Sequence, residues 1–248
     1  MTAGDGWSGY VARYHDANPG ITDDVLAPAV DHAGRNLYDW LVEAVPRGAL
    51  LVDLACGNGA VAQRLPGRVV GIDRSAGELA RARRDCPRAA LVRADAAAVP
   101  VAAGVAGAVT VSMALMVMVP GERVLGEVAR VLRPGGVLVA TVPHRSAAAG
   151  GLREILADLG QAGVGYPAQL DELAERLPEA GFELRDDRCT SFVRQVRAED
   201  ADLVVRSFYS PGADEHRLRY AAARLRERVE AGGVTLAYPI RRIVAVRR

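Results

Sequence analysis

Three aspartates stand at or near the ends of short apolar runs, where a carboxylate can meet a ligand. They and their runs are Asp53 in Leu50–Leu54, Asp73 in Arg68–Asp73 and Asp95 in Ala90–Asp95. Because the carboxyl ends of parallel strands meet at one edge of a sheet, we expect these side chains to border one site. Carboxylates attract cations and accept hydrogen bonds from hydroxyl and amino groups. The pattern therefore predicts a site for a cationic ligand that is rich in hydrogen-bond donors.

A glycine-rich segment after the first aspartate narrows the choice of ligand. Gly57 and Gly59 allow a sharp turn and a close approach of backbone to ligand, and with Ala62 they satisfy the loose dinucleotide pattern G-x-G-x-x-A. Asp53, just before this loop, would repel a pyrophosphate lodged there. It would favour a ligand with an amine and a positive centre, and S-adenosylmethionine has both and carries no phosphate.

The other two aspartates fit the nucleoside part of such a ligand. Asp73 is placed to accept hydrogen bonds from both ribose hydroxyls, and Asp95 to accept one from an exocyclic amine. Each acid alone has a simpler explanation, because Asp73 could cap a helix that begins near Ser75 and Asp95 could open a loop. The three acids together with the glycine loop favour a cationic nucleoside.

These residues resemble the class I S-adenosylmethionine-dependent methyltransferases, in particular the small-molecule, methyltransferase type 11-like enzymes. The similar segments are Val52–Gly59, Ile72–Asp73, Arg93–Ala96 and Arg130–Gly136. The resemblance covers about residues 48–143, and Ala55 stands where the family's glycine pattern begins. It implies S-adenosylmethionine as the cofactor and S-adenosylhomocysteine as the product.

The resemblance also implies a role for each matched position. Gly57 and Gly59, with Ala55 in the same turn, would approach the methionine part of the cofactor, whose ammonium Asp53 would organise. The remaining implied roles are ribose binding by Asp73, adenine binding by Asp95, Ala96 and Arg74, and backbone contacts to the methionine amine from Ser112 and Met113. From the residues themselves, Tyr14 could close over the cofactor, and packing within the N-terminal segment explains it equally well.

Methyl transfer to an aliphatic hydroxyl or a protonated amine requires a group that takes a proton. His144, directly after Thr141–Pro143, is our preferred candidate base, and His15, beside Tyr14, is the second. An ordinary surface histidine is an equal alternative for His144. No metal site is predicted, because the three cysteines stand at unrelated spacings that favour reduced thiols over a zinc site or a disulfide framework.

The segment Val111–Met116 separates the possible classes of substrate. It lacks the Asn/Asp-Pro-Pro-Tyr sequence that enzymes acting on nucleobase amino groups usually carry. Met113, Met116 and Met118 suit an apolar, irregular substrate, or they fill gaps in the core. The 31 basic residues, all arginine, balance 30 acidic ones, so no nucleic acid partner is expected. The absence of lysine excludes a pyridoxal Schiff base and a Walker-type phosphate site.

The leading hypothesis is therefore transfer of a methyl group to an oxygen or nitrogen atom of a small-molecule acceptor, such as a secondary metabolite. The alternatives are an RNA or protein methyltransferase, a non-methylating S-adenosylmethionine-binding protein on the same fold and, more distantly, a nicotinamide oxidoreductase. The N-terminal residues lack the basic and apolar regions of a signal peptide, and no run approaches the roughly 20 apolar residues that span a bilayer. We therefore expect a cytoplasmic location and no membrane partner, while the oligomeric state stays open.

Apolar runs and helical stretches alternate from Ala49 onward, as in a parallel sheet that is buried on both faces. The expected strands are 50–54, 68–73, 90–95, 107–112, 136–142, 182–185 and 240–246, with helical segments near 60–65, 75–85 and 121–132. With the resemblance, they predict an α/β fold: a doubly wound, mostly parallel seven-stranded sheet of the Rossmann-like methyltransferase type. Its last strand would be antiparallel, and helical cap and lid insertions would accompany it.

We expect two parts in the 248-residue chain. Residues 1–46 read as an N-terminal helical cap. Residues 47–248 read as the S-adenosylmethionine-binding α/β methyltransferase domain, with helical insertions at about 146–180 and 191–233. These insertions would form a lid over the carboxyl edge of the sheet, where open α/β sheets bind their ligands.

Overall fold

A seven-stranded sheet forms the centre of the computed structural model, which describes residues 3–144, 151–161 and 175–248. The strand order is β3-β2-β1-β4-β5-β7-β6. The strands are β1 Leu51–Leu54, β2 Val69–Asp73, β3 Ala90–Arg93, β4 Ala106–Ser112, β5 Leu132–Pro143, β6 Phe182–Val196 and β7 Val234–Arg247. β7 pairs antiparallel with both of its neighbours, β5 and β6, and the other strand pairs of this sheet are parallel. The predicted fold class, with its antiparallel last strand, is confirmed.

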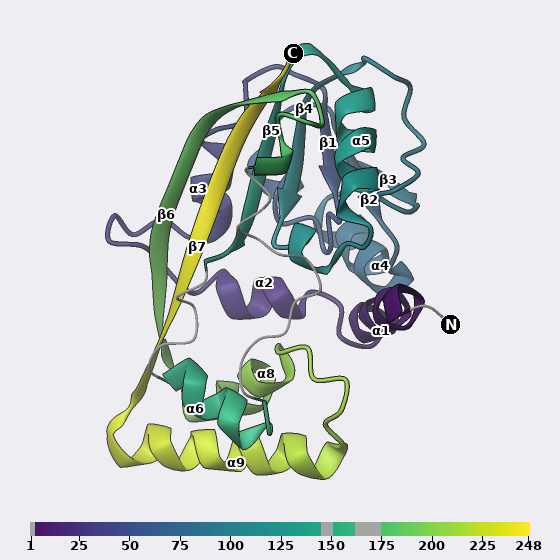
Figure 1. Ribbon diagram of the computed structural model, residues 1–248. Coiled ribbons are helices and arrows are strands. Elements are labelled where there is room, and N and C mark those ends of the chain that lie inside the picture. The colour runs from purple at the N-terminus through teal and green to yellow at the C-terminus, as the bar shows by residue number, and fades with distance from the viewer. Residues whose placement is uncertain (1–2, 145–150, 162–174) are drawn as a thin grey trace.

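Helices lie on both faces of the sheet and at the carboxyl ends of its parallel strands (Figure 1). The α-helices are α1 Ala3–Ala17, α2 Ile21–Leu26, α3 Leu37–Val42, α4 Ala76–Asp85, α5 Gly121–Val131, α6 Gly151–Asp158, α8 Ala201–Arg206 and α9 Glu215–Gly232. Short 3-10 turns form η1 Ala62–Arg64, η2 Leu115–Val117 and η4 Ala198–Asp200. The helix expected near residues 60–65 is thus a single 3-10 turn.

Different helices pack on the two faces of the sheet, and together they hold the strands in position. On one face, α5 buries Val124, Val128 and Val131, which share one stripe of the helix, in a core with Val109 of β4. On the other face, α3 buries Leu37, Trp40 and Leu41 in a second core with β1, β4 and β5. Burial of this apolar area, at about 25 cal/mol per Å², holds the strands in place.

Strands β6 and β7 are much longer than the predicted segments 182–185 and 240–246. They pair from Phe182 with Arg247 to Val196 with Val234, so the helical part of the second insertion begins at Ala198 rather than near residue 191. The sequence does not reveal the full length of β6, because residues 183–191 are mostly polar and exposed. They lack the apolar alternation that marks a half-buried strand.

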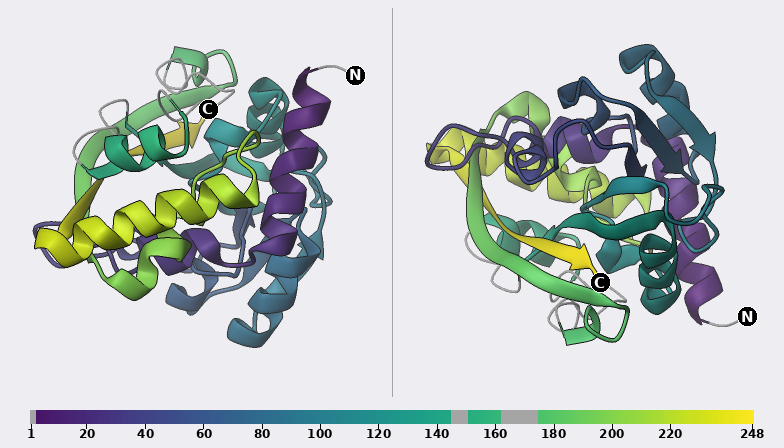
Figure 2. Two further views of the ribbon diagram at one scale, coloured as in Figure 1. Left: turned by 90° about the horizontal axis from the view of Figure 1, so that it is seen from below. Right: turned by 90° about the horizontal axis from the view of Figure 1, so that it is seen from above.

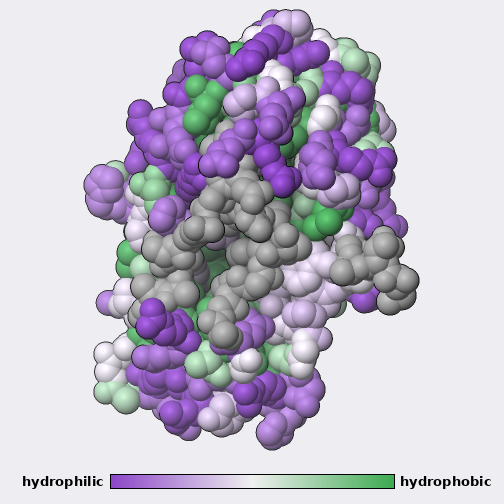
Figure 3. Space-filling model, in the orientation of Figure 1, coloured by the Kyte–Doolittle hydropathy of each residue, from purple (hydrophilic) through white to green (hydrophobic). Residues whose placement is uncertain are grey.

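The distal ends of β6 and β7 carry a small helical unit with its own core. Helices α6, α8 and α9 bury residues such as Ile155, Val204 and Leu225 against Val196 and Leu236 of the two strands. Seen from below, α1 and α9 lie across this end of the molecule (Figure 2). The face in Figure 3 is mostly hydrophilic, with hydrophobic residues visible in scattered small groups. Within the described residues, none of the helices combines the length and apolar character needed to cross a bilayer.

Candidate functional site

A pocket lies at the carboxyl ends of β1–β4, between the sheet and the N-terminal helices. Its lining comes mainly from α1, α2 and the loops that follow these strands, with Tyr209 between α8 and α9 and single residues of α3, α4 and α5. Nine of the eleven predicted cofactor-binding residues line it: Asp53, Ala55, Gly57, Asp73, Arg74, Asp95, Ala96, Ser112 and Met113. The strand ends thus meet where the sequence predicts.

Asp53, in β1, is a buried acid with one oxygen left unpaired. The residue is 1% exposed, and the Thr110 hydroxyl donates a hydrogen bond to its Oδ1 at 2.6 Å. Oδ2 is buried and has no hydrogen-bond partner among the described residues. Desolvation, with a smaller contribution from the charge of Asp73, raises the pKa of Asp53 to about 7. A cationic donor at Oδ2 would satisfy this oxygen and stabilise the ionised form.

The loop after β1 is built from residues in the left-handed region. The φ angles are 51° at Ala55, 52° at Gly57 and 86° at Gly59. Ala55 adopts this conformation in spite of its Cβ, which costs about 1–2 kcal/mol. Gly59 is absent from the pocket lining. A Cβ there would stand 2.5 Å from Sγ of Cys86, so packing against Cys86 requires this glycine, and its cofactor contact stays a prediction.

Asp73, at the end of β2, organises the glycine loop. The N–H groups of Gly57 and Ser75 donate to its two oxygens at 2.9 and 2.8 Å. Burial raises the pKa of Asp73, and these two hydrogen bonds oppose that effect. The N-cap of α4 is Ser75, whose hydroxyl accepts from the N–H of Glu78. The carboxylate of Asp73 therefore borders the pocket with further acceptor capacity for ribose hydroxyls.

Asp95, Ala96 and Arg74 form the more open end of the pocket. Asp95 accepts from the N–H of Ala97 at 2.8 Å. Nε of Arg74 lies 3.7 Å from its other oxygen, and both side chains are about half exposed. Such an exposed pair contributes little to stability, so both groups can turn toward a ligand. Ala96 is buried beside them.

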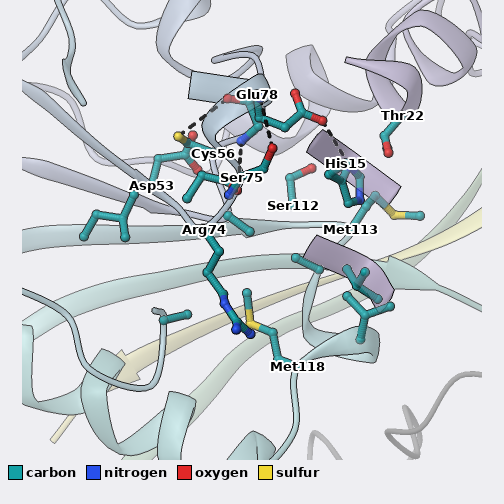
Figure 4. Close-up of a pocket in the computed structure, with 18 of the residues that line it drawn as sticks. His15, Thr22, Asp53, Cys56, Arg74, Ser75, Glu78, Ser112, Met113 and Met118 are labelled. Atoms are coloured by element: carbon teal, nitrogen blue, oxygen red, sulfur yellow. Dashed lines mark hydrogen bonds and ion pairs between the residues drawn. The ribbon is translucent and has the colours of Figure 1, made fainter. Parts of the chain in front are cut away.

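Ser112 and Met113 end β4 at the middle of the pocket (Figure 4). Met113 has a φ of 51°, and its N–H donates to the carbonyl oxygen of Thr141 at 2.9 Å. This bond leaves the carbonyl of Met113, and not its N–H, available for a ligand amine. The Ser112 and Thr141 hydroxyls are 3.2 Å apart.

Sequence reasoning missed an acid and an amide on the same pocket. Nδ2 of Asn58, in the glycine loop, donates to Oδ2 of Asp23 at 2.9 Å, and both residues line the pocket. Oδ1 of Asp23 is buried and has no hydrogen-bond partner among the described residues. Asp23 lies in α2, 30 residues before Asp53, and no motif marks it. Two unpaired carboxylate oxygens therefore border one cavity.

His15, the second candidate base, lines the pocket together with Glu78 and Tyr209. Its Nδ1 lies 2.9 Å from Oε1 of Glu78, and its Nε2 lies 2.8 Å from the Tyr209 hydroxyl. Figure 4 shows His15 and Glu78 linked at the side of the pocket. The three side chains come from α1, α4 and the loop after α8, so no local motif could reveal them.

The other candidate base and Tyr14 lie elsewhere. His144 follows β5, is exposed, and donates its N–H to the Pro239 carbonyl at 2.9 Å; it lines neither pocket described here. The Tyr14 hydroxyl donates to the Arg206 carbonyl at 2.6 Å, and Tyr14 is also absent from the lining. Their predicted roles stay predictions, and the geometry favours His15 over His144.

A second, mostly apolar pocket adjoins the first. The two share Thr22, Met113 and Tyr209, and Met116 and Phe208 line only the second. Met118 lines the first. The predicted methionines therefore border both cavities. In the described part of the chain, no group of three or more His, Cys, Asp or Glu side chains lies together in a way that could hold a metal ion.

Comparisons with known proteins agree with this geometry. Residues 52–140 match the methyltransferase domain family. The demethylmenaquinone methyltransferase of Beutenbergia cavernae is 38% identical over 132 residues, which are 52% of this chain and 53% of that protein. The chain spans about half the length of the curated relatives it matches.

Two solved structures share the fold across most of the chain. The cyclase SpnF has a TM-score of 0.57 and 22% identity, covering 85% of this chain and 79% of that chain. The geranyl diphosphate C-methyltransferase of Streptomyces coelicolor, in complex with S-adenosylhomocysteine, has a TM-score of 0.53 and 15% identity, covering 85% and 77%.

The strand order and the antiparallel β7 define a doubly wound fold, and folds of this kind bind ligands at the carboxyl ends of their strands, where the pocket lies. Residues 52–140 carry a methyltransferase domain, and the chain shares the fold of the class I S-adenosylmethionine-dependent methyltransferases.

Proposed function

We propose that the chain transfers a methyl group from S-adenosylmethionine to a small-molecule acceptor. The observation that carries this proposal is the buried, unpaired Oδ2 of Asp53 beside a loop of left-handed residues. A buried carboxylate oxygen without a partner costs about 1–3 kcal/mol or more, which a cationic ligand would recover. The residues present therefore fit this cofactor, which supplies a methyl group activated on a sulfonium sulfur.

The cofactor's three parts each have residues suited to them. Asp53 and Asp23 would hold the methionine ammonium, each through its unpaired oxygen. Asp73 would accept from the ribose hydroxyls while it keeps its bonds to the loop. Asp95 would accept from the adenine amine, with Arg74 beside the ring. Gly57 would let the backbone approach the ligand closely.

The second pocket supports a small and largely apolar acceptor. Its lining is dominated by side chains such as Leu26, Met116, Phe208 and Ile240. The relative from Beutenbergia cavernae is named for a quinone substrate, which is consistent with an apolar ring compound. Transfer to oxygen or nitrogen stays a prediction. The methylated atom would be identified from the product by mass spectrometry and NMR.

His15 is the candidate base that this proposal retains. It lines the cofactor pocket, and Glu78 holds its ring through Nδ1. A base in this position would take the proton of a hydroxyl or amine acceptor at the moment of attack.

Calorimetry with two nucleosides tests the cofactor assignment. S-adenosylhomocysteine carries the amino-acid ammonium, whereas methylthioadenosine lacks the amino-acid part. Asp53→Asn and Asp23→Asn should each lower the affinity for S-adenosylhomocysteine about tenfold, or about 1.4 kcal/mol. Neither substitution should change the affinity for methylthioadenosine. Asp187→Asn, in β6 outside both pockets, is the matched control. Equal losses for both nucleosides would overturn the assigned roles.

A cofactor-binding protein that does not transfer methyl groups is the second candidate. It is supported by the fold shared with the cyclase SpnF. Tight S-adenosylhomocysteine binding without any methylated product, across apolar hydroxyl and amine acceptors, would favour it. Steeply salt-dependent binding to RNA would instead favour a macromolecular acceptor.

A further inference from the structure

Three side chains from distant parts of the sequence form a hydrogen-bonded series at the edge of the cofactor pocket. Oε1 of Glu78 lies 2.9 Å from Nδ1 of His15, and Nε2 of His15 lies 2.8 Å from the Tyr209 hydroxyl. None of the cofactor contacts proposed above uses this series, although all three residues line the cofactor pocket. We call it the Glu78–His15–Tyr209 relay.

The surroundings of Glu78 set the direction of the relay. Its side chain is 4% exposed and lies in the first turn of α4, where the helix dipole favours negative charge. The N–H of Gly20 donates to Oε2 at 2.8 Å, which leaves Oε1 for His15. An ionised carboxylate only accepts, so Nδ1 of His15 carries the proton. In the neutral ring Nε2 is then the acceptor, and the Tyr209 hydroxyl donates to it.

Tyr209 is the member of the relay that reaches the second pocket. His15 and Glu78 line only the cofactor pocket, whereas Tyr209 lines both. Aromatic rings of α1 surround it, with centroid distances of 4.9 Å to Tyr14 and 5.9 Å to Trp7. The phenol is thus held by packing at the boundary between the two cavities.

We propose that Tyr209 is a catalytic residue that takes the acceptor's proton and passes its own to His15, which Glu78 positions. This inference rests on the proposed function. It assigns the second pocket to an apolar acceptor with an ionisable O–H or N–H group.

The proposed step balances in atoms and charge. The acceptor atom forms its bond to the methyl carbon while the carbon–sulfur bond breaks, so the sulfonium charge is lost. The acceptor's proton passes to the Tyr209 oxygen, and the phenol proton passes to Nε2 of His15. The resulting imidazolium is stabilised by Glu78 and later releases its proton to water.

Nitrogen NMR of the wild-type protein tests the relay without turnover. The chain has four histidines, and the His15 signals are identified by their loss in His15→Gln. The relay requires a ring with its proton on Nδ1 and none on Nε2. Glu78→Gln should weaken this preference, whereas Tyr209→Phe should retain it and shift only Nε2. An Nε2–H tautomer or an imidazolium in the wild type would overturn the relay.

Turnover of a 1,4-naphthohydroquinone probe separates the relay from a structural role. Tyr209→Phe should lower kcat about a hundredfold, the usual contribution of a positioned proton acceptor, while the affinity for S-adenosylhomocysteine stays the same. Equal turnover in Tyr209→Phe and wild type would overturn the proposal. Failure of the wild type to methylate any acceptor would count against the proposed function, and the tautomer of His15 would still decide the relay.

Discussion

The two walls of the cofactor pocket are built in different ways. The motif wall, formed by Asp53, Gly57 and Asp73, comes from neighbouring strand ends in a short stretch of sequence. The cap wall, formed by His15, Asp23 and Tyr209, comes from segments up to 194 residues apart. The motif wall contains a strained loop and a desolvated acid, whereas the cap wall is held by ring packing and side-chain hydrogen bonds. Local strain therefore marks the wall proposed to bind the cofactor, and long-range contacts mark the wall proposed to meet the acceptor.

The largest effect is expected at Gly59, on the side of the glycine loop that faces away from the ligand. Gly59→Ala places a Cβ 2.5 Å from Sγ of Cys86 at a φ of 86°. We expect a loss of about 3 kcal/mol in the free energy of unfolding, from left-handed strain and overpacking. Urea unfolding measures it.

Ala55→Gly is the matched control for Gly59→Ala in the same loop. It relieves left-handed strain at a φ of 51° without adding atoms, so it should stabilise the protein by up to about 1 kcal/mol. Equal stabilities of Gly59→Ala and wild type would contradict the strained description of the motif wall.

Asp53→Asn tests whether the buried carboxylate of the motif wall lowers the free energy of unfolding at neutral pH. The pKa of Asp53 is raised from 3.8 to about 7, so its stabilising contribution is complete below about pH 4 and is lost as pH rises through about 7. Each pKa unit corresponds to about 1.4 kcal/mol. The amide does not ionise, and the cost of its unpaired NH₂ group is the same at both pH values, so that cost cancels in the comparison. We therefore expect Asp53→Asn to gain about 3 kcal/mol relative to wild type between pH 5 and pH 8.

Chemical denaturation at the two pH values measures this change, and Asp187→Asn serves again as the control. The pKa of Asp187 is lowered by its hydrogen bond to Arg241. That control should therefore lose stability relative to wild type above about pH 4, which is the opposite sign. A pH-independent difference for Asp53→Asn would show that Asp53 is not desolvated in the folded protein.

The motif wall was readable from the sequence because its constraints are local. Asp53 and Asp73 stand at fixed offsets from apolar runs and glycines, and strand pairing alone brings them together. The fold class was readable for the same reason, since alternating buried runs imply crossovers. At Gly59 the sequence shows the need for a glycine and not the Cys86 side chain behind it.

The sequence predicts a helical cap and names His15, but it does not show which residues meet in the cap wall. His15 and Tyr209 meet only after β6 and β7 extend past the sheet and carry α8 and α9 toward α1. No periodicity encodes that meeting, and the polar faces of β6 concealed the strand that makes it possible. The same lack of a local signal explains why His144, adjacent to a strand end, was preferred over His15.

Asp73→Ala tests the motif wall by ligand binding. The substitution removes the acceptor for the ribose hydroxyls and frees the N–H groups of Gly57 and Ser75. We expect the affinities for S-adenosylhomocysteine and for methylthioadenosine both to fall at least tenfold, because both ligands carry the ribose. Asp95→Ala, at the exposed end of the pocket, should cost less. Unchanged affinity in Asp73→Ala would remove the ribose assignment.

Tyr14→Phe, the smallest expected effect, tests where the cap wall ends. Its hydroxyl donates to the Arg206 carbonyl and not to the pocket, so its loss should lower the free energy of unfolding by about 1 kcal/mol. The affinity for S-adenosylhomocysteine, measured by calorimetry, should stay the same. A severalfold loss of affinity would restore the predicted cofactor contact of Tyr14. The cap wall would then include the aromatic helix face beside His15, and the two walls would share the task of closing over the cofactor.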